Sequence, residues 1–363
     1  MGVVVKNIVL CFDRTRAHPG LRDASNAEAL FRLLDDGAGQ LTWYHSGTRT
    51  LALRWREAAI DDARAGIAGA YAFLLDSWEP GDRIFIFGVG RGAFCARELS
   101  RLLGTVGVLP AEWDDLVDYV LASYALPRTR RTPQDWQRVS RLAARLAGRR
   151  EIAVPVQFLG LWDTVRVPGL PKLSTADPLS NVVAGRHAVA IDGGYCPFGE
   201  HLVAAGNERI EEVWFRGAHC DIAGGSGACW PLADIALDWV LDGAVRAGAT
   251  VRAGHRDGAP APTDLDALAE SARTISFRSL PADALVHASV DMYLRAHPEY
   301  WRRLPAQVLW ADVDWLARGE RLVRTAEPPA AAAERHAFVA AASSPAANRV
   351  PPQATTRDAS VLR

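Results

Sequence analysis

Two aspartates and two histidines follow apolar runs of the chain, at points where strands would end: Asp163, His219, Asp221 and His287. Because the carboxyl ends of parallel strands meet at one edge of a sheet, these side chains can gather there. An aspartate that orients a histidine, which then takes a proton from a hydroxyl, is the machinery of a Ser-His-acid hydrolase. An acid after the penultimate strand and a histidine after the last strand favour Asp221 with His287. Asp163 and His219 remain alternatives to that pair.

The stretch 81–103 has the pattern in which such a hydrolase carries its nucleophile. An apolar run over 84–87 enters the turn Gly88-Val89-Gly90-Arg91-Gly92 and leaves as a helical pattern. In a nucleophile elbow, G-x-S-x-G, small flanking residues let a strained backbone present a serine. Here Gly90 occupies the serine position, and glycine has no atom that can attack a carbonyl. Taken alone, the stretch is equally compatible with an ordinary glycine-rich turn between a strand and a helix.

The elements that must position these residues alternate along the chain. We expect strands at 3–12, 41–45, 84–87, 154–161, 212–215 and 274–277. We expect helices at 24–36, 55–78, 93–103 and 232–245. Strands that are apolar throughout are typical of a parallel sheet buried on both faces. The βαβ alternation predicts an α/β fold with a doubly wound, mostly parallel sheet and right-handed crossovers.

Residues 111–150 differ in character and predict a basic helical insertion where hydrolases carry a cap or lid. Residues 128–150 contain eight arginines and one acid, Asp135. One interpretation is a solvated helix face, and the other is a surface for a lipid headgroup or a protein partner, carried by Arg138, Arg141 and Arg145. The predicted division is a core of 1–110 and 151–325, the insertion 111–150, and an Ala/Pro-rich tail, 326–363, which reads as a linker or mobile terminus.

Composition excludes several classes of protein. A chain of 363 residues, 49% of them hydrophobic, can bury a large α/β core. No run approaches the ~20 apolar residues that a membrane span needs. The start of the chain has neither a basic segment nor a cleavage site and is expected to be a first strand. The cysteine pattern favours reduced thiols, so a cytoplasmic location is expected. A formal net charge of −1 gives no global attraction to nucleic acid. Five cysteines without paired C-x-x-C spacing predict no disulfide framework, and we expect no metal or cofactor.

Seven blocks carry a further signal, in this order: NIVLCFDRT, GDRIFIFGVGRGAFCAREL, VQFLGLWDTV, GRHAVAID, VWFRGAHCDIAGG, LADIALDWVL and LVHASV. Together they resemble the uncharacterised α/β-hydrolase family that includes the first class of type VI secretion phospholipase effectors. The resemblance implies an α/β-hydrolase fold and, in active members, hydrolysis of phospholipid esters by a serine at the position of Gly90. It also implies that the two aspartates and two histidines belong to the site region. Export without a signal peptide would follow from the same resemblance.

The chain departs from the family pattern at the chemistry itself. The family elbow reads G-F-S-R-G, whereas this chain reads GVGRG, so the serine is absent. The family's first strand ends in Asp-Gly-Thr, whose glycine lets backbone N–H groups face an oxyanion. Here the arginine of Asp13-Arg14-Thr15 would crowd that space. We expect four residues to line it: Asp13, Arg14, Thr15 and Arg91.

Two hypotheses about function follow. In the first, the protein is a pseudoenzyme that acts by binding a protein partner or a lipid or acyl ligand, because the groups left without a serine retain at most ~10³–10⁴-fold catalysis over water. In the second, it is an active esterase or phospholipase that uses activated water or another nucleophile. Cys95 is a poor substitute, since it lies on the elbow helix and should face the sheet.

Overall fold

A computed structural model describes residues 5–13, 24–47, 56–110, 113–127, 131–170, 179–193, 202, 207–252, 262–271 and 276–317. Contacts divide the chain into a first unit, Met1–Leu322, which holds every described residue, and a second unit, Val323–Arg363. Arg14, Thr15 and the predicted tail at 326–363 lie outside the described residues.

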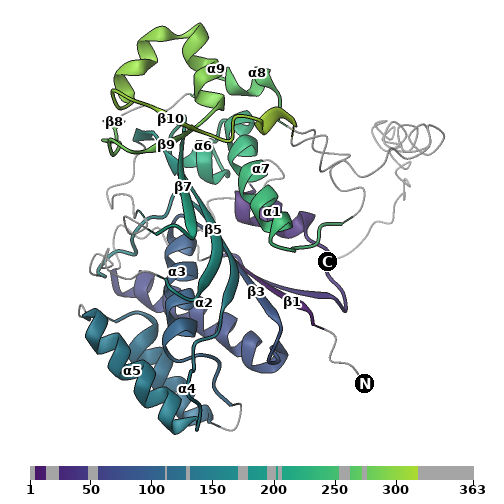
Figure 1. The fold of residues 1–363 in the computed structure, drawn as a ribbon, viewed down its shortest axis with the longest axis vertical. Coiled ribbons are helices and arrows are strands. Elements are labelled where there is room, and N and C mark those ends of the chain that lie inside the picture. The colour runs from purple at the N-terminus through teal and green to yellow at the C-terminus, as the bar shows by residue number, and fades with distance from the viewer. Residues whose placement is uncertain are drawn as a thin grey trace, which may run out of the picture. The chain divides into compact units, whose positions relative to one another are not determined.

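A parallel sheet forms the centre of the first unit (Figure 1). Its strands are β1 (Asn7–Phe12), β2 (Gln40–His45), β3 (Arg83–Val89), β4 (Val156–Trp162), β5 (Val182–Ala190), β7 (Ile210–Phe215), β9 (Leu285–His287) and β10 (Leu309–Ala311). They lie in the order β10-β9-β7-β5-β4-β3-β1-β2, and each neighbouring pair is parallel. The predicted α/β fold with a mostly parallel sheet is confirmed.

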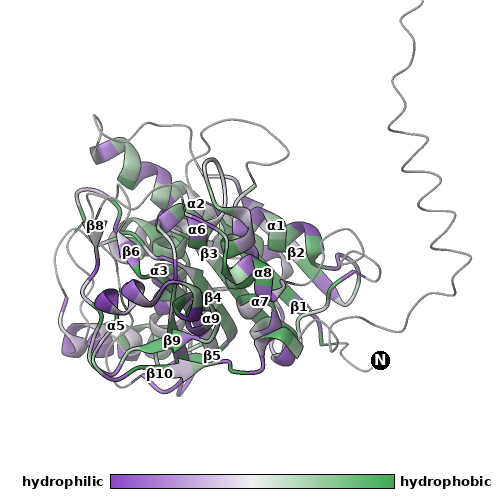
Figure 2. Cartoon of the chain, turned by 90° about the horizontal axis from the view of Figure 1, so that it is seen from above, coloured by the Kyte–Doolittle hydropathy of each residue, from purple (hydrophilic) through white to green (hydrophobic). Residues whose placement is uncertain are grey.

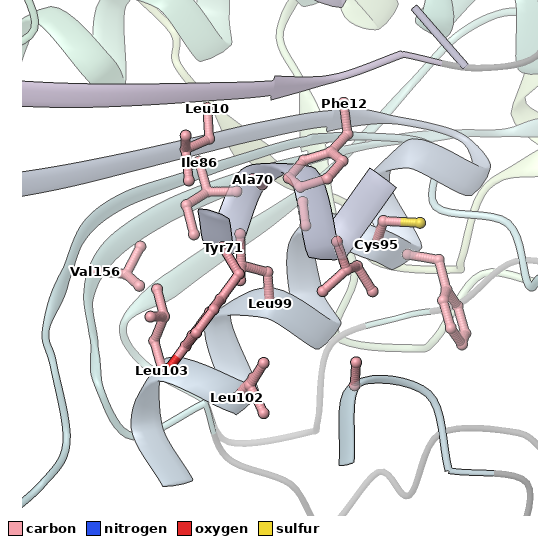
Figure 3. Packing of buried hydrophobic residues seen from close by; sticks show 14 of the residues in the cluster. Leu10, Phe12, Ala70, Tyr71, Ile86, Cys95, Leu99, Leu102, Leu103 and Val156 are labelled. Carbon is pink, nitrogen blue, oxygen red and sulfur yellow. The ribbon is translucent and has the colours of Figure 1, made fainter. Parts of the chain in front are cut away.

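Helices cover both faces of the sheet because its strands are apolar on both sides. Ile8 and Leu10 of β1 belong to one buried cluster, together with side chains of α2 (Arg56–Ser77) and α3 (Arg91–Thr105). Figure 3 shows part of that cluster, with Leu10 of β1 beside Ile86 of β3. The alternate residues Val9 and Cys11 pack on the other face with α1 (Asn26–Leu33) and α7 (Trp230–Arg246). In Figure 2 the strands at the centre are accordingly among the most apolar segments.

The predicted basic insertion forms α4 (Asp114–Val120), a π-helical turn η1 (Leu121–Ala125) and α5 (Pro133–Leu146). Thr132 caps α5, because its side chain accepts from the backbone N–H of Asp135 at 3.2 Å. One side chain, Arg101 of α3, connects the elbow helix to this segment. Its guanidinium pairs with Glu98, donates to the carbonyl of Tyr124 at 3.1 Å and lies 3.9 Å from the centre of the Trp136 ring. A cation over an indole face is favourable, so this contact fastens α5 to α3.

The remaining elements include one correction to the predicted strands. Of the strand expected at 274–277, the structure describes β8 (Ser276–Phe277), which pairs antiparallel with β6 (Asp192–Gly193) in a separate small sheet. The last strands of the main sheet are β9 and β10 instead. The other helical segments are α6 (His219–Ala223), α8 (Asp264–Ala267), α9 (Ser289–Ala296), η3 (Pro298–Arg303) and η4 (Trp315–Ala317).

Candidate active site

Gly90 lies between the end of β3 and the start of α3, in a backbone conformation that side chains disfavour. Its φ is 56° and its ψ is −111°. The last residue of β4 and the turn after it hold this peptide on both sides, since the N–H of Gly90 donates to the carbonyl of Trp162 at 2.9 Å and its carbonyl accepts from the N–H of Val165 at 3.0 Å. The predicted strand, turn and helix are present, and the turn projects position 90 away from the sheet edge.

Two flanking glycines allow this tight turn. A Cβ atom at Gly88 would lie 2.6 Å from backbone atoms of Ala93, and one at Gly92 would lie 2.4 Å from the carbonyl oxygen of Phe12. Both distances are far inside van der Waals contact, so glycine is needed for the strand and the helix to approach so closely.

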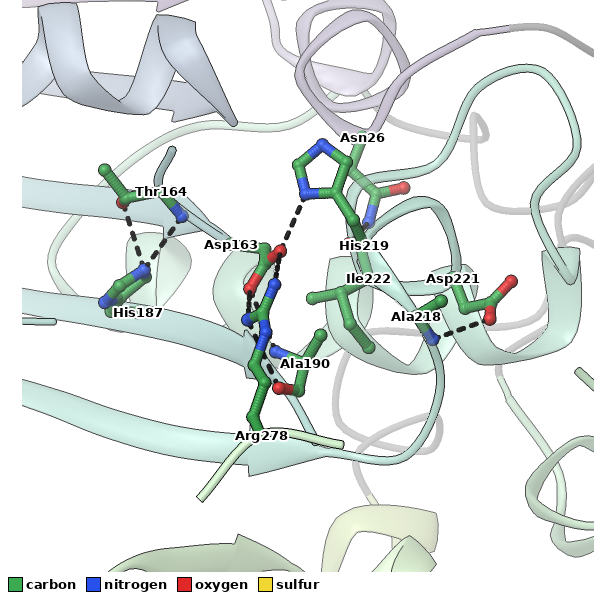
Figure 4. A network of polar contacts seen from close by, with 10 residues as sticks. All are labelled: Asn26, Asp163, Thr164, His187, Ala190, Ala218, His219, Asp221, Ile222 and Arg278. Carbon is green, nitrogen blue, oxygen red and sulfur yellow. Dashed lines mark hydrogen bonds and ion pairs between the residues drawn. The ribbon is translucent and has the colours of Figure 1, made fainter. Parts of the chain in front are cut away.

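His219 stands directly beside Gly90. A Cβ atom at Gly90 would lie 3.1 Å from Cε1 and 3.3 Å from Nε2 of His219. The other ring nitrogen of His219, Nδ1, lies 2.7 Å from Oδ2 of Asp163 (Figure 4). With Nδ1–H donating to the carboxylate, Nε2 is left as the acceptor on the side of Gly90. An oxygen carried by a side chain at position 90 would therefore lie within reach of a histidine that can take its proton.

Asp163 is completely buried and is held by donors on all sides. Its Oδ1 accepts from the N–H of Ala190 at 3.1 Å, and Arg278 donates to both carboxylate oxygens, at 2.5 and 2.9 Å. Burial alone would raise the pKa of this carboxyl, but the charge of Arg278 and the hydrogen bonds from His219 and Arg278 outweigh it. The pKa of Asp163 therefore lies well below its ordinary value, and the residue is a carboxylate at neutral pH.

The turn after β4 is fixed by a second histidine. Asp163 has a φ of 41°, a value that few residues other than glycine adopt. Nε2 of buried His187 accepts from the backbone N–H of Thr164 at 3.2 Å, and Nδ1 of His187 lies 2.9 Å from a carboxylate oxygen of Glu212. These bonds hold the peptide after Asp163, so they stabilise the unusual backbone that aims its carboxylate at His219.

Asp221 and His287, the pair favoured by chain order, have other partners. Asp221 accepts from the N–H groups of Ala218 and Cys229, at 2.8 and 2.7 Å, so it shapes the turn that carries His219. His287 is completely buried at the end of β9, where it bonds to Ser289 at 2.8 Å and to Asp312 at 3.2 Å.

The chain-order argument did not anticipate this arrangement. The sheet continues past β7 to β9 and β10, and His287 ends β9. The histidine beside Gly90 is instead His219, which follows β7. The pair that the structure brings beside Gly90 is Asp163 with His219.

The residues expected around an oxyanion are described in part. Asp13 directly follows β1, where its N–H donates to the carbonyl of His45 at 2.9 Å and its carboxylate accepts from the Tyr44 hydroxyl. Arg91 is the first residue of α3, at the end of a helix where backbone N–H groups point outward. Thus α3 offers N–H groups next to position 90, as an oxyanion site requires.

Two contributors to this region were missed from the sequence. Arg278 lies 115 residues from its partner Asp163 in the chain, and its loop has no periodic pattern, so the sequence holds no signal for the ion pair. His187 lies next to Arg186 in β5, and because these polar side chains hid the strand, the sequence did not indicate the role of His187.

Arg278, the ion-pair partner of Asp163, also lines a cavity of about 650 Å³. Its other lining residues include apolar, cationic and acidic side chains: Leu280, Tyr293, Tyr300, Arg302, Arg303 and Glu299. The cavity could therefore accept a ligand that has an anionic and an apolar part.

Other candidate chemistry is weak in the described part of the chain. Cys95 is buried, and burial raises the pKa of its thiol far above neutral pH, so it is not a ready nucleophile. No group of three or more potential metal-binding side chains occurs within the described ranges. Among the helices that the structure describes, none combines the length and apolar character required to span a bilayer.

Residues 6–243 of the 363-residue chain match the family described as the type VI secretion system (T6SS) phospholipase effector Tle1-like, catalytic domain. The chain belongs to this family. The family that the sequence blocks resemble is thereby confirmed. The Tle1-like region contains Gly90, Asp163, His219 and Asp221, whereas His287 lies beyond its end.

Other proteins are similar to this Tle1-like chain. The uncharacterized protein YEL023C of Saccharomyces cerevisiae is 32% identical over 211 residues, which cover 52% of this chain and 31% of that protein. A solved structure of the Tle1 effector bound to the VgrG spike is 17% identical, with a TM-score of 0.34, and the match covers 61% of this chain and 51% of that one. A crystal structure of an uncharacterized protein from Pseudomonas aeruginosa is 15% identical, with a TM-score of 0.43, and the match covers 96% and 60%. The chain thus matches less than a third of the yeast protein's length.

Proposed function

We propose that this Tle1-like protein has lost ester hydrolysis and acts through binding on the retained scaffold. The observation that carries the proposal is the place of Gly90. A side chain there would touch His219, and His219 is bonded to a buried carboxylate, yet residue 90 has no side chain. In this proposal, Gly90 marks the position of the nucleophile, His219 is the base, and Asp163 is the acid that orients the base.

The missing oxygen has a large energetic effect. A hydrolase of this kind splits one difficult step into two by forming an acyl-enzyme on its serine. Without the serine, the remaining groups can only stabilise a developing charge and activate water, which retains at most ~10³–10⁴-fold over the uncatalysed rate. Such residual ester hydrolysis is too slow for an effector that acts by hydrolysing membrane phospholipids. Binding is therefore the function that this site still supports.

The partner that we propose is a protein or a lipid or acyl ligand. The cavity beside Arg278 supports the lipid or acyl ligand, because its lining combines apolar side chains with three arginines, against one acid, Glu299. Membership in a family of T6SS effectors supports export by that route, without a signal peptide.

The test compares the native protein with its Gly90→Ser variant in hydrolysis of a short-chain ester and of a phospholipid. We expect turnover only in Gly90→Ser, and we expect His219→Ala to abolish it. His287→Gln in the same background is the matched control, since it removes the other candidate histidine; circular dichroism checks that each variant is folded. Turnover by the native protein would contradict the proposal, and dependence on His287 instead of His219 would contradict the assignment of the pair.

A second function is favoured by one specific observation. Nε2 of His219 faces position 90 while Nδ1 is bonded to Asp163, so a water molecule in the space of the missing side chain could be activated as a nucleophile. Native protein that hydrolyses esters slowly, and loses that activity in His219→Ala, would establish this water-activated esterase in place of the pseudoenzyme.

A further inference from the structure

The outer face of α5 combines arginines and leucines in one continuous stripe. We call Arg138, Arg141, Leu142, Arg145 and Leu146 the α5 stripe. At about 100° per residue, these five side chains span an arc of about 140° on the helix. The opposite side of α5 carries Ala144, which is buried, and Trp136, which contacts Arg101 of α3. The α5 stripe therefore faces away from the body of the protein, and Figure 1 shows α5 at the edge of the fold, beyond α3.

The charge of the α5 stripe is poorly neutralised. Along α5 the only acid is Asp135, which caps the helix start and lies 3.5 Å from Arg138. Arg141 donates to the backbone carbonyl of Gln137, and within the described residues Arg145 has no ion-pair partner. With a formal net charge of −1 for the whole chain, these arginines form a local basic surface. Such a surface is complementary to an anionic partner.

The leucines of the α5 stripe narrow the choice of partner. Leu142 and Leu146 are each 57% exposed, one helical turn apart and directly beside the arginines. A nucleic acid or an acidic protein surface would satisfy the arginines but would gain little from two exposed leucines on a convex helix. A bilayer that contains anionic lipids offers negative headgroups and, just below them, an apolar layer.

We propose that the α5 stripe docks on an anionic lipid bilayer, with α5 lying in the plane of the membrane surface. The arginines would contact headgroup phosphates, and the leucines would enter the boundary between headgroups and acyl chains. This surface is separate from the Gly90 site, and its binding does not require hydrolysis. It goes beyond the proposed function by naming where the protein meets a membrane.

The experiment measures sedimentation of the full chain with vesicles of phosphatidylcholine, with and without phosphatidylglycerol. The native chain is expected to bind only the vesicles that contain phosphatidylglycerol, and added salt should weaken binding because it screens the arginines. Arg141→Glu with Arg145→Glu should lower the partition coefficient by at least about 20-fold, since each basic residue near such a surface contributes roughly fivefold. Leu142→Ser with Leu146→Ser should lower it by about tenfold or more, because the buried apolar area is lost.

The matched control is Arg252→Glu with Arg295→Glu, which changes the net charge equally at two exposed positions that lie outside α5 and outside the cavity lining. This control should retain most of the binding. The proposal is overturned if the native chain does not bind the anionic vesicles, if neither α5 double variant weakens binding, or if the control weakens it as much. Because turnover is not measured, failure here is distinguishable from failure of the pseudoenzyme proposal.

Discussion

At the scale of single residues, Asp163 decides what the site can do. Its carboxylate is shared between His219 and the guanidinium of Arg278, whose side chain is only 7% exposed. In a Ser-His-acid site the aspartate stabilises the imidazolium that forms when the histidine accepts a proton. Arg278 donates to both oxygens of the same carboxylate, so His219 shares its acid with a second cationic partner.

Replacing Asp163 should be costly for the fold itself. In Asp163→Asn, the buried guanidinium of Arg278 loses its counter-ion, and we expect the free energy of unfolding to fall by about 3–5 kcal/mol. Urea denaturation followed by fluorescence measures the change. Adding Arg278→Gln to this variant should recover part of the loss, because the unpaired charge is removed. A loss below about 1 kcal/mol in the single variant would show that the pair is not important for stability.

At the scale of elements, the elbow depends on close contact between α3 and two strands. Gly92 lies under the carbonyl of Phe12, and Gly88 lies against the first turn of α3. These contacts place the start of the helix at the sheet edge, next to position 90. The position of residue 90 is thus determined by the packing of β1, β3 and α3 against one another, and not by the turn alone.

Adding one methyl group should disturb this packing. Gly92→Ala must push the helix away from β1, and we expect a loss of stability of about 1–3 kcal/mol or more. Gly39→Ala is the matched control, because a Cβ there would meet nothing within 4 Å. Thermal unfolding compares the two variants. Equal melting temperatures would contradict the close approach.

The same elements show what the sequence could and could not predict. Unbroken apolar runs such as β1 and β3 indicated a buried parallel sheet, and the glycine turn indicated the junction between β3 and α3. Polar residues within β5, including Arg186 and His187, hid that strand, and β9 and β10, each three residues long, gave too short a pattern. The pairing of Asp163 with His219 depends on which strands lie beside β3, and that spatial order is set by tertiary packing that no local pattern encodes.

At the scale of the whole molecule, buried carboxylates link stability to pH. Burial would raise the pKa of Asp82 and Asp163, but hydrogen bonds and charge from Lys6 in the first case, and from Arg278 and His219 in the second, lower both pKa values. A carboxyl with a lowered pKa in the folded state contributes stability above its unfolded pKa of about 3.9. That contribution is lost as pH falls toward the folded pKa.

We therefore expect the stability that Asp82 and Asp163 contribute to be nearly constant above about pH 5 and to be lost as pH falls below about 4. Asp234 acts in the opposite sense, because burial and the nearby Asp266 and Asp238 raise its pKa to about 6, so its contribution falls as pH rises toward that value. Urea denaturation across this range provides the measurement. The Asp163→Asn variant should show a shallower fall, since one of the responsible carboxyls is gone. Stability that is unchanged or higher at about pH 3 would contradict the assignment of these charges.

The most direct measurement of the central claim is covalent labelling by an organophosphonate that reacts with activated serines. We predict that intact-mass spectrometry finds no adduct on the native protein and one adduct on Gly90→Ser. Peptide mapping should place this adduct on the peptide that contains the substitution, and adding His219→Ala should suppress it. That result would establish position 90 as a nucleophile position served by His219. A folded Gly90→Ser variant that is not labelled, or a native protein labelled at another serine, would contradict the account.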